Sequence, residues 1–121
     1  MSCQNDDARP GSERAHKARI ANLNDQLRQG TGAGQAFITE GILAIGEGAV
    51  ADILTLVASF TEFDNSNDPH QERDYGSFIY LTHKIFWKID YYDRSLEFGS
   101  PDPADPDVTT RVLTIMLARE Y

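Results

Sequence analysis

The side chains with the clearest capacity for chemistry lie in one polar segment, residues 64–74. Oxygen-rich clusters that include an imidazole can bind a hard divalent cation, and this segment begins like a calcium-binding loop. Pro69, however, stands where that loop requires glycine, and Tyr75 stands where it requires a bidentate glutamate. Such side chains also form Asx turns with their own backbone. The candidate metal or polar site consists of Asp68, His70, Glu72 and Asp74. We predict no particular metal for it, and we expect no cofactor.

Two further carboxylates, Asp90 and Asp93, follow in an aromatic segment. A pair of carboxylates can act as acid and base when burial separates their pKa values. The structural alternative is that Asp93 begins an ordinary turn and that Lys88 pairs with Asp90 on one face of a strand. His70 is followed two residues later by a glutamate, as in zinc deaminases, but no Pro-Cys-x-x-Cys follows, which excludes that chemistry. No serine or cysteine stands in a nucleophile motif.

The aromatic segment at residues 78–93 must position these groups, and it predicts two β-strands joined at Thr82 and His83. β-branched and aromatic residues suit a half-buried pleated surface, and here they alternate. Because side chains alternate across a strand, one face is expected in the core, and it carries Ile85, Trp87, Ile89 and Tyr91. The other face mixes charge with aromatic rings, which favours either a protein interface or a cover formed by the N-terminal helix. This candidate partner-binding face consists of Phe86, Lys88, Asp90 and Tyr92.

The hydrophobic periodicities on either side of this hairpin predict the other elements. Asp105 followed by Pro106 is a favoured helix start, because an aspartate caps a helix and proline fits its first position. The expected elements are a helix at 12–29, a strand at 35–39, a helical turn at 42–45, a helix at 47–60, the hairpin, a third strand at 96–98 and a helix at 106–121. The predicted fold class is α+β, with a small antiparallel sheet of three to four strands packed by three helices in the order α-β-α-β-β-β-α.

The length and composition of the chain bound its organisation. A chain of 121 residues is one domain by size, and we expect residues 1–11 to form a flexible tail and residues 12–121 to form a single domain. Cys3 is the only cysteine, so no intrachain disulfide can form, and the thiol is either inert or able to cross-link two chains in air. No apolar run reaches the roughly 18 residues of a membrane span, and the polar start lacks a signal peptide's apolar segment. We therefore expect a cytoplasmic protein that does not enter a membrane.

The net charge of −8 indicates which partners the surface can attract. Nucleic-acid binding depends on cations that displace the counterions of the phosphates, so direct binding to nucleic acid is not expected. An acidic domain can instead meet a basic protein surface. Solubility alone is the other explanation, since this much charge is ordinary for a small domain.

Several strings of residues resemble a known family. The string Phe86-Trp-Lys-Ile-Asp-Tyr-Tyr-Asp93, with residues 99–105 and 111–121, is similar to the signature of domain of unknown function 3768, a family of small alphaproteobacterial proteins. The likeness extends upstream through residues 19–25 and 67–70, and it covers about residues 15–121. The resemblance implies no activity and no catalytic residue. It implies a mobile-element or host-defence context, because relatives are common on mobile elements near anti-restriction genes.

Two hypotheses about function follow from these patterns. The first is a non-enzymatic acidic interaction or regulatory protein that binds another protein through the face of Phe86 and Tyr92 or through its acidic loops. A homodimer through an edge strand or through that face is compatible with it. The alternative is a small enzyme that uses metal or acid-base chemistry at residues 64–74 with Asp90 and Asp93. An enzyme needs a concave pocket in which these groups converge, whereas an interaction module needs a flat aromatic patch.

Overall fold

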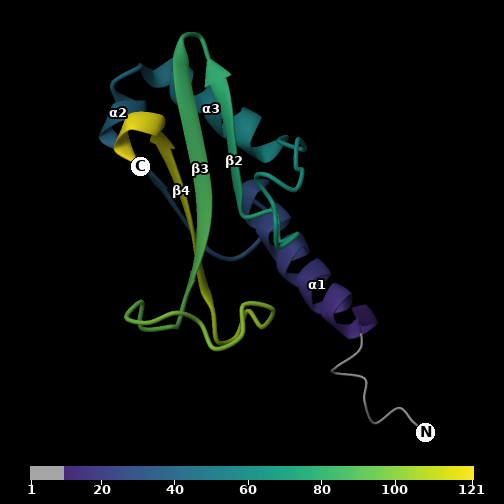
Figure 1. Ribbon diagram of the computed structural model, residues 1–121. Helices are drawn as coiled ribbons and strands as arrows, with labels where there is room; N and C mark the ends of the chain where they lie inside the picture. Colours follow the sequence, from purple (N-terminus) through teal and green to yellow (C-terminus); the bar gives the residue numbers. More distant parts are fainter. Residues whose placement is uncertain (1–9) are drawn as a thin grey trace, which may run out of the picture.

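A computed structural model describes residues 10–121 of the chain, which form a four-stranded sheet with helices on one side (Figure 1). The helices are α1 (Pro10–Arg28), α2 (Glu40–Leu43) and α3 (Glu47–Ala58), and the strands are β1 (Gln35–Ile38), β2 (Tyr75–Tyr80), β3 (His83–Tyr92) and β4 (Thr110–Leu117), followed by the 3-10 turn η2 (Ala118–Glu120). The strand order is β1-β4-β3-β2. The α+β class, the four strands and the three helices confirm the prediction. Cys3 and most of the predicted tail lie outside the described residues.

The final element of the prediction is wrong, because residues 110–117 form strand β4 rather than a helix. β4 lies in the middle of the sheet, between β1 and β3, and is buried on both faces. Such a strand is apolar almost throughout, so its apolar residues also match helical spacing. The β-branched residues of this segment favour a strand, and they predict it better than the helical spacing does; they are Thr110, Val112, Thr114 and Ile115.

The sheet is mixed rather than wholly antiparallel. β1 runs parallel to β4, with Gln35 beside Val112 and Ile38 beside Ile115, whereas β2 with β3 and β3 with β4 are antiparallel. A parallel pair needs a long crossover, and the chain between β1 and β4 supplies one through two helices and the hairpin. The distance between the two strands in the sequence gives no local signal of this pairing.

The expected strand at residues 96–98 is also absent from the sheet. Asp93 accepts hydrogen bonds from the amides of Ser95 and Glu97 at 3.1 Å each, and Leu96 adopts a left-handed φ of 62°. The chain therefore turns sharply here because a side chain takes the backbone donors that a strand would share with a neighbour. Only Gly99 makes an isolated bridge, to Tyr92.

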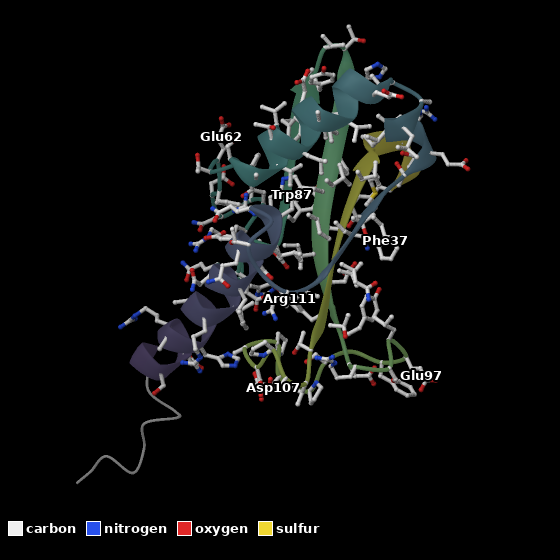
Figure 2. The ribbon with its side chains drawn as sticks, turned by 180° about the vertical axis from the view of Figure 1, so that it is seen from behind. Phe37, Glu62, Trp87, Glu97, Asp107 and Arg111 are labelled. Atoms are coloured by element: carbon white, nitrogen blue, oxygen red, sulfur yellow. The ribbon has the colours of Figure 1, made fainter. Side chains whose placement is uncertain are left out.

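The hydrophobic core lies between the helices and one face of the sheet, as the view from behind shows (Figure 2). The alternation predicted for β3 is confirmed, because Ile85, Trp87 and Ile89 are buried together with Ile53 and Val57 of α3 and with other core residues, namely Leu27, Ile42, Leu113, Ile115 and Leu117. Gly76 of β2 makes room for the indole, since a Cβ there would lie 2.5 Å from Trp87 Nε1. No helix among residues 10–121 is long and apolar enough to cross a membrane.

Candidate functional site

The candidate site is the face of the sheet that carries no helix, which we call the open face. All three helices pack on the opposite side (Figure 1). The register places Phe86 beside Met116 and Ser77, Lys88 beside Thr114 and Tyr75, and Tyr92 beside Thr110. The structure thus brings the four predicted residues to one half-buried surface, formed by Phe86, Lys88, Asp90 and Tyr92. The N-terminal helix does not cover it, because α1 packs against the core face through Leu27.

A cluster of three aromatic rings occupies part of the open face. The ring of Phe86 lies 5.6 Å from Tyr75 and 5.5 Å from Tyr121, and Tyr75 lies 6.4 Å from Tyr121, all in edge-to-face geometry. Such pairs contribute about 0.5–1.5 kcal/mol each beyond area burial. Tyr121 stays 72% exposed, so the cluster presents a ring to solvent rather than closing over itself.

Glu120 holds Tyr121 in this position. Its carboxylate accepts hydrogen bonds from Thr39 Oγ1 at 2.6 Å, from the Leu117 amide at 2.8 Å and from the Gly41 amide at 3.1 Å. The hydrogen bond from Thr39 is the largest cause that lowers the pKa of Glu120 below its ordinary value, because it favours the charged carboxylate. The 3-10 turn is therefore tied to the start of α2, and the ring that follows it is directed onto β3.

Lys88 and Asp90 form an ion pair on the same face. Lys88 Nζ donates to Asp90 Oδ2 at 2.7 Å, and this bond is the main reason that the pKa of Lys88 is raised. Asp93 is engaged elsewhere, since it accepts from the hydroxyl of Ser95 at 2.8 Å and the pKa of Asp93 is lowered by that bond. The structure thus assigns each of the two carboxylates to its own local partner, as the structural alternative predicted.

Residues 64–74 fold as a loop stabilised by its own side chains. Asp64 accepts from the amide and the hydroxyl of Ser66 at 2.8 and 2.6 Å, and Asn67 accepts from the Asp64 amide at 2.8 Å. Buried Asp68 accepts from the amides of Glu72 and Arg73 at 3.0 and 2.9 Å. The bond between Asp64 and the Ser66 amide is the Asx turn that such a sequence favours, and Asp68 binds amides four and five residues further on. Asp68 is therefore directed into the loop backbone.

The other candidates in this loop have different surroundings. Glu72 accepts from the hydroxyl of Tyr91 at 2.9 Å, Asp74 is half-buried, and His70 is exposed. Burial is the first cause that raises the pKa of Asp74, and the nearby charge of Glu72 is the second. Within residues 10–121 no group of three or more His, Cys, Asp or Glu side chains is arranged to hold a metal ion. The structure therefore does not arrange Asp68, His70, Glu72 and Asp74 as a set of metal ligands.

A buried polar network that the sequence did not predict lies on the helix-covered side. Asn24 of α1 donates to the Tyr91 hydroxyl at 2.8 Å and to the Glu72 carbonyl at 3.0 Å, and it accepts from Arg111 Nε at 2.9 Å. The Arg111 guanidinium also donates to the Pro103 carbonyl and lies 5.3 Å from the centre of the Tyr91 ring. Desolvation is the main cause that lowers the pKa of Arg111. This network joins α1, the polar loop, β3 and β4.

A cleft of about 710 Å³ lies beside this network, near the end of α1. Arg28 donates to the carbonyls of Val57 and Phe60 at 2.7 and 3.1 Å and to Asp25 at 2.7 Å. Arg73 binds the other side of Asp25 through two nitrogens, at 3.0 and 2.6 Å. Arg28 thus donates to carbonyls at the end of α3, where Val57 also accepts from the Phe60 amide, and its charge favours that end of the helix dipole. The cleft is built of residues that hold α1 to α3.

Sequence reasoning missed two residues of the aromatic cluster, Tyr75 and Tyr121. Tyr75 precedes the predicted hairpin at residues 78–93, although it alternates with Ser77 and Ile79, a period that marks a strand face. Tyr121 was assigned to a helix, and no local signal places it on β3. The buried network offered no signal either, because Asn24, Tyr91 and Arg111 are far apart in the sequence.

The fold and this face define a small α+β protein with a helix-free sheet surface. A family model described as "Protein of unknown function (DUF3768)" matches residues 38–120. The chain belongs to this family. The matched range contains the strings that carry the resemblance from residue 67 to residue 120, whereas residues 19–25 lie outside it. No curated protein and no solved structure matches the chain.

Proposed function

We propose that this protein is a non-enzymatic, cytoplasmic interaction protein that binds a basic surface of another protein through its open face. The observation that carries the proposal is the aromatic cluster of Tyr75, Phe86 and Tyr121, with Tyr121 left in solvent. Aromatic residues dominate the binding energy of protein interfaces, because they bury large rigid surfaces. The net charge of −8 supports a basic partner, since opposite charge accelerates encounter.

The open face extends beyond this cluster toward both edges of the sheet. Phe37 of β1 and Ile79 of β2 are exposed large apolar residues, and the register places both on the same face as Phe86. The Lys88–Asp90 ion pair lies between apolar groups and adds a polar feature that a partner can recognise. An apolar surface with a few oriented charges is typical of a recognition site.

The enzymatic alternative receives less support from the geometry. Asp90 faces the open side of the sheet, whereas Glu72 bonds Tyr91 on the helix-covered side. Asp93 and Asp68 each accept hydrogen bonds from their own loops. Two clefts of about 710 and 630 Å³ lie along α1, and the candidate residues are divided between them, since Asp68 lines the first and Glu72 the second. Acid-base chemistry needs these groups within reach of one substrate atom.

The cellular setting of the proposal rests on the family resemblance alone. It supports a partner that belongs to a mobile-element or host-defence system. The identity of a captured partner tests this setting directly.

Affinity capture tests the proposed function. The tagged chain is used to isolate partners from a lysate of its native cells at low and at moderate salt, and bound proteins are identified by mass spectrometry. We expect a stoichiometric partner whose recovery falls with Phe86→Ala, Tyr92→Ala and Tyr121→Ala. Phe98→Ala is the matched control, because Phe98 is 71% exposed but lies in the loop after β3.

Two results of this experiment would contradict the proposal, and one would support it. A partner that binds all three variants as well as the wild-type chain would contradict a role for the open face. A self-associating chain, detected by sedimentation and abolished by Tyr121→Ala, would replace the basic partner with a second copy. Retention of binding by Phe98→Ala with loss in Tyr121→Ala supports the open face.

A further inference from the structure

Strand β2 forms one edge of the sheet, and its outer backbone is unpaired among the described residues. The Asp74 carbonyl accepts from the Ile89 amide at 2.8 Å, which fixes the phase of the ladder with β3. In an antiparallel pair, alternate residues bond the neighbouring strand. Residues 76, 78 and 80 therefore bond β3, and the amides and carbonyls of Ser77 and Ile79 point outward. No backbone bond to another segment involves either residue within residues 10–121.

A groove runs beside this edge. Its volume is about 190 Å³, and it is lined by Ser77 and Phe78 of β2 and by Leu56, Phe60 and Glu62 from α3 and the chain that follows it. Figure 1 shows the end of α3 next to the outer side of β2. A cavity of roughly 150 Å³ accommodates benzene, so this groove has room for one large apolar side chain.

The usual protection of an edge strand is missing at β2. Natural sheets guard their edges with charged residues, proline, bulges or very short strands, because an unpaired edge is a template for another strand. β2 has the sequence Tyr-Gly-Ser-Phe-Ile-Tyr, without charge or proline, and Ile79 is 60% exposed. The opposite edge, β1, has only four residues.

The rim of the groove is acidic. Asp52 of α3, one helical turn before the groove residue Leu56, accepts a hydrogen bond from the Tyr80 hydroxyl of β2 at 2.7 Å, and Glu62 lines the groove itself. α3 contains no lysine or arginine. Lys84 is opposite Ile79 in the ladder, but its side chain belongs to the open face. A second copy of this chain would bring like charges together, whereas a basic segment would neutralise them.

We propose that the outer edge of β2 binds an extended segment of a partner protein by β-strand addition. The amides and carbonyls of Ser77 and Ile79 pair with the segment, and one apolar side chain of the segment fills the groove between Phe78 and Leu56. Residues on the same side of a strand recur about every 6.6 Å, so lysine or arginine two positions away on each side reaches toward Asp52 and Glu62. The recognised pattern is basic-x-apolar-x-basic.

This surface adjoins the aromatic cluster, since Tyr75 of the cluster belongs to β2, but strand addition uses the backbone edge and the groove rather than the rings. The cluster lies on the open face of the sheet, whereas the groove lies at the edge, on the side of α3. The strand-addition site therefore stands or falls independently of the proposed open-face interaction.

The test begins with a library of random ten-residue peptides displayed on phage and selected against the whole chain. We expect enrichment of the basic-x-apolar-x-basic pattern. A synthetic peptide of the enriched sequence should protect the amides of Ser77 and Ile79 from hydrogen exchange, because these donors meet solvent in the unbound chain and a carbonyl in the complex.

Two matched pairs of variants locate the binding site. Ser77→Pro removes an outward amide without removing a ladder bond, and Ala36→Pro does the same on β1, where the neighbouring Thr39 amide fixes the phase by bonding the Ile115 carbonyl. Leu56→Lys places a cation in the groove, and Leu54→Lys is its control on the same helix, with 39% exposure against 40%. We expect peptide affinity to fall about tenfold or more in the first member of each pair and to stay unchanged in the second.

Three outcomes would overturn the proposal. The first is the absence of enrichment above background. The second is peptide binding that survives both Ser77→Pro and Leu56→Lys, with folding of each variant verified by circular dichroism. The third is a homodimer in sedimentation that Ser77→Pro dissociates, which would assign the edge to a second copy.

Discussion

The two sides of β3 use similar residue types for opposite purposes. On the helix-covered side, Tyr91 lies in a network with Asn24 and Arg111, in which each group has a partner inside the protein. On the open side, Tyr121 and Phe86 contact each other, and Tyr121 leaves most of its surface in solvent. Internal partners stabilise a fold, whereas unused surface is available for recognition.

A side chain of a reactive type can also be unavailable for chemistry, because its polar atoms are already bonded inside the protein. The carboxylate of Glu72 is a natural candidate for metal binding or acid-base work, yet it accepts a hydrogen bond from Tyr91 and serves the network. Asp68 is likewise occupied by two backbone amides. The carboxylates that the sequence suggests for catalysis therefore stabilise the fold. Aromatic residues form the surface that is open to a partner.

The most disruptive change should be Asn24→Leu. Asn24 is 0% exposed, and leucine would leave the Arg111 Nε donor and the Glu72 carbonyl without a partner. Buried groups left unpaired cost about 1–3 kcal/mol each, so we expect a loss of about 3–5 kcal/mol in the free energy of unfolding. Urea denaturation measures it. Asn65→Leu, at an exposed position of the polar loop, should change stability by about 0.5 kcal/mol or less. Equal effects would refute the structural role of the network.

Phe86→Ala should weaken partner binding at least as much as it lowers the free energy of unfolding. Phe86 is half-buried, so we expect a cost of roughly 1–2 kcal/mol in stability, below the roughly 3–5 kcal/mol of a fully buried phenylalanine. Binding to the captured partner should weaken by about 2 kcal/mol, as at an interface hot spot. Denaturation and calorimetric titration on the same samples give both values. A large loss of stability with unchanged affinity would place Phe86 among the structural residues.

The pH dependence of stability tests the polar loop through Asp74→Asn. Burial raises the pKa of Asp74 above its ordinary value of 3.8, so the folded state holds its proton more tightly than the unfolded chain. Stability from this group is therefore full below that ordinary pKa and is lost as the pH rises through the raised value. Asp74→Asn should remove this loss and give a small gain at neutral pH relative to the wild-type chain. Denaturation from about pH 3 to about pH 7 measures it, and a variant less stable at neutral pH would contradict the assignment.

The smallest effect is expected for the Lys88–Asp90 pair. Both side chains are about one-third exposed, at 36% and 37%, and the pair lies on the open face. Solvent screens such pairs, so a double-mutant cycle with Lys88→Met and Asp90→Asn should give a coupling below about 1 kcal/mol that declines with added salt. A coupling of several kcal/mol would mean that the open face is as structurally committed as the buried network.

Local periodicity was sufficient to predict the elements that bury one face, because their buried residues recur at a single spacing. The alternation of Ile85, Trp87 and Ile89 identified the core face of β3, and helical spacing identified α3. The prediction failed for β4 because a strand that is buried on both faces does not alternate between apolar and polar residues. Its apolar run then matches helical spacing equally well. The parallel pairing of β1 with β4 is non-local and leaves no trace in either segment.

The same limit applies to the candidate site, because local spacing predicts some of its residues and the tertiary fold determines the others. Phe86 and Tyr92 could be placed on a shared face from their spacing along one strand. Tyr121 could not, because its position depends on Glu120 bonding Thr39 across the molecule. The buried network depends on Asn24 meeting Tyr91 and Arg111, so it requires the tertiary fold to be known first.

The central position of β4 governs when this protein can fold during synthesis. Residues 110–117 supply the neighbour of both β1 and β3, so a nascent chain that ends before them can form the hairpin and the helices but not the sheet. The ribosome must release nearly the whole domain before the core can close, and β1 has no strand to pair with until then. Completion of this fold is therefore an event that follows translation of the domain, at the stage when chaperones have most access to it.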